Sequence, residues 1–60
     1  MFRYRVYDTE GEELGEAAYA QRIFPGETVW LSGARMVQVV SVVDTPDSDL
    51  YEGLLSVEAA

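Results

Sequence analysis

The chain has 60 residues, with eleven acidic residues against four basic ones and a formal net charge of −7 at pH 7. It contains no cysteine and no histidine, which excludes a disulfide framework and a zinc site built from those ligands. A chain of this length buries only about 60% of its unfolded surface, so we expect one small domain over residues 1–60. Its acidic surface repels phosphate and disfavours nucleic-acid binding.

Residue usage adds expectations about origin and compartment. Lysine and asparagine are absent, and Val, Ala, Gly, Glu and Arg dominate, which indicates a GC-rich coding sequence typical of some bacteria and their phages. No apolar run approaches the roughly 18–20 residues that a membrane-spanning helix needs. The first five residues, Met-Phe-Arg-Tyr-Arg, lack the apolar core of a signal peptide. We therefore expect a cytoplasmic protein without membrane contact.

The first half of the sequence predicts a β-hairpin. Phe2–Asp8 alternates between two faces, Glu10-Gly11 supplies a tight loop, and Leu14–Ile23 returns as the second strand. The only helical alternative is Glu12–Arg22, whose composition suits a helix. Gly15, and an apolar pattern that does not follow a 3.6-residue period, argue against that helix.

The register of this hairpin follows from its side chains. A loop at Glu10-Gly11 sets an ion pair on the outer face, with a large-on-small pair and an aromatic pair on the inner face. The three predicted pairs are Arg5 with Glu16, Tyr4 with Ala17, and Phe2 with Tyr19. A slip by one residue would place Glu16 on the core face, so we favour the first register.

A second hairpin is predicted in the middle of the chain. Phe24-Pro25-Gly26-Glu27 fits a type II turn, because Pro presets φ at the second position and Gly accepts a positive φ at the third. Thr28–Leu31 is the third strand, and Ser32-Gly33 is a two-residue hairpin turn. This register places Trp30 opposite Arg35 and Val29 opposite Met36.

The remaining chain predicts two more strands. In the fourth, Ala34–Asp44, both parities of Val39–Val43 are apolar, which favours a β-bulge at a barrel corner over a strand covered on both faces. Thr45–Asp49 is a polar turn, and Leu50–Val57 is the fifth strand. Residues 58–60 should fray. The fold class is therefore all-β, a single five-stranded antiparallel small barrel in meander order.

This pattern resembles the SH3-like small barrels. The run Pro-Gly-Glu-Thr-Val-Trp-Leu from Pro25, followed by Ser32-Gly33, is similar to the "P-G-[DE]-x-V-x-L…G" run common in that class. The paired-aromatic "ALYDY"-type motif of peptide-binding SH3 domains and the basic loops of ribosome-associated barrels are both missing. The resemblance therefore implies a fold but transfers no functional residues.

Catalysis and metal binding find little support in the sequence. Without His, Cys or Lys, only carboxylates and hydroxyls remain for acid–base or nucleophilic chemistry, and a packed barrel of this size hardly encloses a cleft. Asp44, Asp47 and Asp49 lack the spacing of a calcium loop and read as turn formers. The acidic run of residues 10–13 reads as a solvated hairpin tip. We expect no enzyme, no cofactor and no metal.

Six residues are candidates for binding. Trp30 and Arg35 on one face would form a cation–π pair, and Trp30 is either an exposed anchor or the largest core residue. Arg3, Arg5 and Tyr7 form a second patch that could grip phosphate or a stacked base, although two arginines are few against a net charge of −7. Tyr51 is a further aromatic anchor.

These features favour a non-enzymatic protein-interaction module with an acidic surface, aromatic anchors and a protein or peptide partner of basic character. Two alternatives remain open. Exposed strand edges would make the chain a homo-oligomer or a subunit of a larger assembly. A nucleic-acid-linked role would consist of weak binding through Arg3 and Arg5 or of mimicry of nucleic-acid charge.

Overall fold

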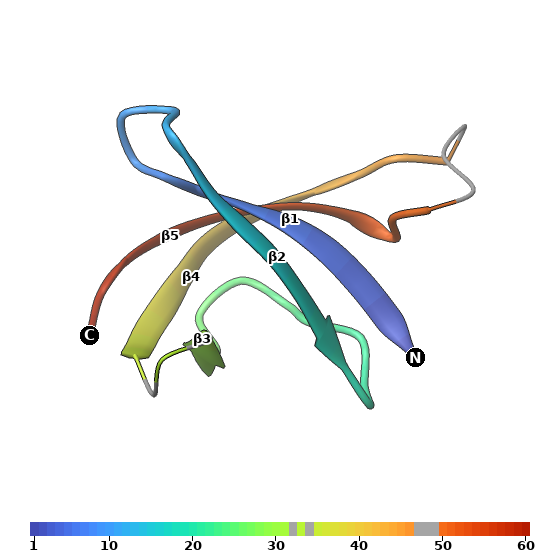
Figure 1. Cartoon of the computed structure of the whole chain (residues 1–60), viewed down its shortest axis with the longest axis horizontal. Helices are drawn as coiled ribbons and strands as arrows, with labels where there is room; N and C mark the ends of the chain where they lie inside the picture. Colours follow the sequence, from blue (N-terminus) through green and yellow to red (C-terminus); the bar gives the residue numbers. More distant parts are fainter. Residues whose placement is uncertain (32, 34, 47–49) are drawn as a thin grey trace.

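A computed structural model describes residues 1–31, 33, 35–46 and 50–60, and this part of the chain contains strands and no helix (Figure 1). Five strands follow one another along the chain: β1 (Phe2–Asp8), β2 (Glu13–Tyr19), β3 (Thr28–Leu31), β4 (Arg35–Asp44) and β5 (Gly53–Ala59). The all-β class and the five strands are confirmed. The helical alternative is wrong, because its residues form β2 and the start of the connection to β3.

The sheet has the strand order β2-β1-β5-β4-β3, and β1 pairs with β5 in parallel. The prediction of a purely antiparallel meander is therefore wrong. The physical reason is the odd number of strands. When five strands run up and down in succession, the first and the last point the same way, so the pair that joins them is parallel. The sheet stays open between β2 and β3, which makes it a half-barrel (Figure 1).

The first hairpin has the predicted pairs over most of its length. Arg5 lies opposite Glu16, and the Tyr4–Ala17 and Phe2–Tyr19 pairs are also present. At the tip the predicted two-residue loop is wrong, because the Asp8 N–H donates to the Glu12 carbonyl at 2.9 Å and leaves three residues in the loop. A bulge then takes up the extra residue, since the partners step from Gly15 to residue 13 across Val6/Tyr7.

The turn before β3 confirms the type II prediction. Gly26 has a φ of 93°, and the Glu27 N–H donates to the Phe24 carbonyl at 3.3 Å. This turn also docks on the next hairpin strand. The Gly26 N–H donates to the Val39 carbonyl, and the Val39 N–H donates to the Glu27 carbonyl, both at 2.8 Å.

The second hairpin differs from its prediction by one residue. Leu31 pairs with Arg35 and Trp30 with Met36, so the turn spans three residues in place of two. Gly33, inside this turn, has a φ of 84°, which glycine adopts at little cost. Ser32, the other residue of the predicted turn, and Ala34, the predicted first residue of the fourth strand, lie outside the described residues.

Strands β4 and β5 confirm one expectation and correct another. The predicted bulge is present, because the β4–β5 register shifts between Val39 and Ser41. The predicted last strand begins too early and ends too early. The observed strand starts at Gly53 and ends at Ala59. Glu58 and Ala59 lie opposite residues 38 and 37 of β4, so the predicted fraying of these two residues is wrong.

The core lies inside the curve of the sheet and consists of one tyrosine and seven aliphatic side chains. These are Tyr4, Val6, Ile23, Val29, Val37, Val39, Leu55 and Val57. Ile23 does not come from a strand. It lies in the connection between β2 and β3, which crosses the open side of the half-barrel in Figure 1, and its N–H donates to the Tyr4 hydroxyl at 3.0 Å. This connection fills the side that no strand pairing closes.

Candidate functional site

Trp30 lies on the outer face of the sheet. Its side chain is 57% exposed, whereas the preceding Val29 is only 7% exposed and belongs to the core. Directly opposed residues of an antiparallel pair share a face, so Met36, at 43% exposure, stands beside Trp30. The alternative in which Trp30 is the largest core residue is therefore wrong.

The surroundings of Trp30 can be followed across three strands. Thr28 of β3 lies opposite Gln38 of β4, which in turn lies opposite Glu58 of β5, and all three are exposed. This row adjoins the Trp30–Met36 pair on the same face. We call these five residues, Thr28, Trp30, Met36, Gln38 and Glu58, the Trp30 face. It combines two large apolar side chains with one carboxylate.

The predicted cation–π pair between Trp30 and Arg35 does not form. Arg35 lies opposite Leu31, and neighbouring residues of a strand point to opposite faces of the sheet. Because the turn is one residue longer than predicted, Arg35 pairs one position away from Trp30 and lies on the opposite face of the sheet. The cation–π contacts in the described part of the chain are instead Arg5 over the Tyr51 ring, at 5.4 Å, and Arg22 over the Phe2 ring, at 5.6 Å.

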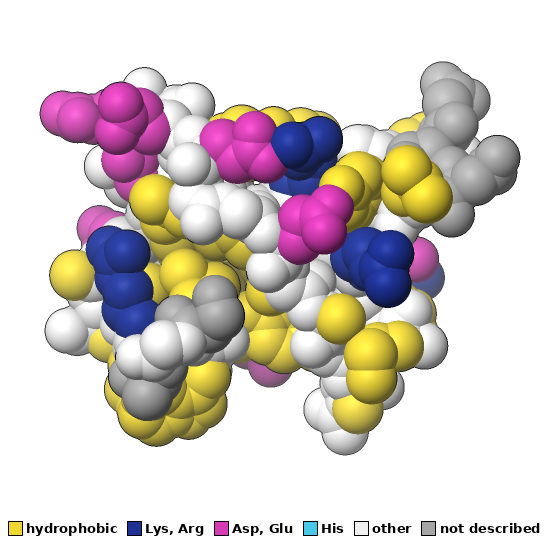
Figure 2. Space-filling view, viewed as in Figure 1, with side chains coloured by type: hydrophobic (Ala, Val, Ile, Leu, Met, Phe, Trp, Pro, Cys, Tyr) yellow, Lys and Arg dark blue, Asp and Glu magenta, His cyan; other side chains and the backbone are white. Residues whose placement is uncertain are grey.

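A polar cluster covers the outer face of β1 and β2. The Arg5 guanidinium donates through Nε to Glu13 Oε2 at 2.9 Å, and the same guanidinium lies over the Tyr51 ring. The Tyr51 hydroxyl donates to Glu16. The structure thus brings together Arg5 and Tyr51, two of the predicted binding residues, although they are far apart in sequence. Figure 2 shows acidic and arginine side chains side by side over these strands.

The charges in this cluster do not favour the binding of a phosphate group. Two carboxylates, those of Glu13 and Glu16, surround the one guanidinium of Arg5, and the hydrogen bond to Glu13 raises the pKa of that guanidinium. Arg3 is exposed on the same strand and lines a shallow hollow with Glu16, while the half-buried Tyr7 lies opposite Glu13. The Arg3, Arg5 and Tyr7 patch is therefore interleaved with acids.

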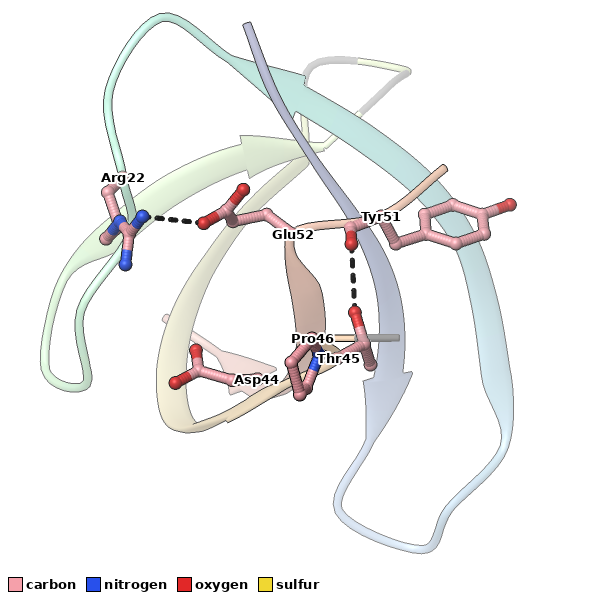
Figure 3. A pocket seen from close by; sticks show the side chains of 6 residues that line it. All are labelled: Arg22, Asp44, Thr45, Pro46, Tyr51 and Glu52. Carbon is pink, nitrogen blue, oxygen red and sulfur yellow. Dashed lines mark hydrogen bonds and ion pairs between the residues drawn. The ribbon is translucent and has the colours of Figure 1, made fainter. Parts of the chain in front are cut away.

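A pocket that sequence reasoning missed lies where the β2–β3 connection meets the start of β5. It has a volume of about 340 Å³ and is lined by Arg22, Asp44, Thr45, Pro46, Tyr51 and Glu52 (Figure 3). Arg22 contacts Glu52 at 2.7 Å, and the Thr45 hydroxyl donates to the Tyr51 carbonyl at 2.9 Å. The Tyr51 ring points away from Arg22 (Figure 3).

The pocket was not predictable because its parts come from three separate segments with no shared motif. Its acids do not gather into a metal site, since the described residues contain no group of three potential metal ligands. Asp47 and Asp49, which the sequence places in the neighbouring turn, lie outside the described residues. Arg22 is paired with one carboxylate, and the pocket as a whole carries two acids against one arginine.

Comparison with models of known protein families, with curated proteins and with solved structures found no match. Within the described residues, no helix is long and apolar enough to cross a membrane. Exposed hydrophobic side chains lie at several places in the view of Figure 2, and one of these groups lies at the end that carries β3 and the Trp30 face.

Proposed function

We propose that this chain is a non-enzymatic protein-interaction module that binds its partner through the Trp30 face. The observation that carries the proposal is the position of Trp30. The core consists of eight side chains, yet the largest side chain of the protein is 57% exposed outside it. Large aromatic side chains are enriched among the residues that dominate binding energies, and an exposed apolar pair of this kind is typical of an interaction site.

The partner in this proposal has basic character. The net charge is −7, and two of the four arginines, Arg5 and Arg22, already contact carboxylates. Glu58 adds a carboxylate to the Trp30 face itself. A partner that carries arginine or lysine beside an apolar segment would be steered toward this surface and would match it on contact.

The proposal extends to the fold class. The all-strand half-barrel is compatible with a small barrel, and the Pro-Gly turn leading into β3 is in keeping with the SH3-like resemblance of the sequence. We therefore propose an SH3-like fold. This assignment adds no binding residues, because function resides in the particular surface and not in the fold.

The test is selection of a displayed library of short random peptides on the full chain, followed by titration of the recovered peptides. We expect sequences rich in Arg, Lys and apolar residues, and we expect Trp30→Ala to weaken their binding at least about tenfold. Val43→Ala is the matched control, because Val43 is also 57% exposed but lies near the other end of β4. Unchanged affinity of Trp30→Ala would disprove the role of Trp30.

A further inference from the structure

Among the described strands, none lies beside the edge of β3 that faces away from β4. In the sheet order, β3 is the last strand, and its four residues pair only with β4. The Glu27 carbonyl accepts from Val39 of β4, and backbone groups alternate in direction along a strand. Val29 and Leu31 therefore bond to β4, whereas the N–H and C=O groups of Thr28 and Trp30 point toward the open side.

One side chain reaches this edge within the described part of the chain. The Tyr19 hydroxyl, from the end of β2, donates to the Trp30 carbonyl at 3.1 Å. The connection between β2 and β3 crosses this opening, but its described N–H groups bond elsewhere: that of Ile23 to the Tyr4 hydroxyl, and that of Gly26 to the Val39 carbonyl. The edge therefore offers the Thr28 and Trp30 N–H groups beside the exposed Trp30 ring.

We propose that an extended segment of a basic partner adds to this edge as a sixth strand, beside the Trp30 side chain. The inference rests on the proposed function and specifies its binding mode. Backbone hydrogen bonds to Thr28 and Trp30 would supply affinity, and the Trp30–Met36 pair would select apolar side chains. The edge is about 13 Å long at 3.3 Å per residue, which suits a short peptide.

Charge decides between a basic peptide and a second copy of this chain. Two copies would each bring a net charge of −7 to the contact, and their repulsion opposes edge-to-edge pairing. A peptide with alternating arginine and apolar residues meets the acidic surface with the opposite sign. Tyr19 does not block it, because a ligand N–H can replace the Tyr19 hydroxyl at the Trp30 carbonyl, one hydrogen bond for another.

The probe is an acetylated, amidated peptide of about seven alternating Arg and Val residues, titrated into the full chain while Trp30 fluorescence and the backbone amide NMR signals are recorded. We expect binding that shifts the Thr28 and Trp30 amides. A version N-methylated at every residue keeps the side chains and the charge but has no N–H to donate along either edge, and it should bind at least about tenfold more weakly.

Thr28→Pro is the complementary change in the chain. It removes an N–H that points to the open edge and breaks no bond to β4, which is the place where an edge strand tolerates proline. This variant should also lose at least about tenfold in affinity. Because the N-methylated peptide tests the same edge with the unaltered chain, the conclusion does not depend on the stability of the proline variant.

The outcomes separate this inference from the proposed function. If the N-methylated peptide binds as well as the parent peptide while Trp30→Ala abolishes binding, the module stands and strand addition is wrong. If the parent peptide shows no binding at about 1 mM, or Trp30→Ala binds it unchanged, both fail. If sedimentation shows a dimer that excludes the peptide from the β3 edge, the occupant is a second copy and the inference is overturned.

Discussion

The two seams of the half-barrel are closed by different means. At the β1–β5 seam, five consecutive residue pairs join the strands through backbone hydrogen bonds, and side chains on the inner face, such as Val6 and Leu55, are fully buried. At the β2–β3 seam no strands pair within the described part of the chain, and Ile23 and the Tyr19 hydroxyl bridge the gap. The paired seam therefore supplies most of the stability of this small protein, while the groups available for binding lie at the open seam.

The largest effect should come from the paired seam. Leu55→Ala removes a side chain with no exposed surface from the centre of the core, and such changes cost about 2–5 kcal/mol in the free energy of unfolding. A domain of this size has little more to lose, so the variant should be largely unfolded by circular dichroism. The neighbouring Leu54→Ala is the matched control, since Leu54 is only half-buried and its loss should leave a folded protein.

Gly53 tests the other side of β5, where this strand pairs with β4. A Cβ at this position would lie 2.6 Å from the Val43 carbonyl oxygen, which belongs to the backbone and has little room to move. Gly53→Ala should lower the free energy of unfolding by about 1–3 kcal/mol, measured by urea denaturation. A variant as stable as the parent would show that β4 and β5 lie farther apart at this point than described.

At the open seam, Trp30→Ala removes the largest side chain of the protein. Since more than half of that side chain is already exposed, we expect a loss of only about 1 kcal/mol in urea denaturation. A loss as large as that of Leu55→Ala would mean that Trp30 belongs to the core and is not a free binding surface.

Tyr19→Phe should have the smallest effect, about 0.5–1 kcal/mol, because it removes one partly exposed hydrogen bond to the Trp30 carbonyl. Burial raises the pKa of the Tyr19 phenol above its ordinary value near 10. The neutral phenol therefore stabilises the folded chain below that pH, and the contribution is lost as the pH rises through the folded-state pKa. The stability difference between the parent and Tyr19→Phe should shrink in alkaline solution, and a constant difference would contradict this role.

Local patterns predicted most of the strands. Alternation and turn chemistry placed Phe2–Asp8 and Thr28–Leu31 with their observed bounds, and side-chain pairing predicted Arg5 opposite Glu16. These features depend on residues close together in the chain. The bulge in β4 was also predictable, since a run of valines cannot alternate between inside and outside.

The remaining features depend on contacts that local patterns do not encode. Glycine suits both two-residue and three-residue turns, so the turn at Gly33 and with it the partner of Trp30 were predicted one residue out. The strand Thr28–Leu31 is short and three of its four residues are apolar, so its sequence does not indicate which side chains face the core. The parallel β1–β5 pair and the Arg22 pocket join segments far apart in the sequence, and no spacing rule indicates either of them.

Amide hydrogen exchange of the free protein, followed residue by residue by NMR, tests the contrast between the two seams most directly. We predict slow exchange for residues 54–57, which pair on both sides, and fast exchange for the Thr28 and Trp30 amides, which face the open edge. Protection of Thr28 and Trp30 equal to that of β5 would contradict the account, because it would mean that the β3 edge is already covered.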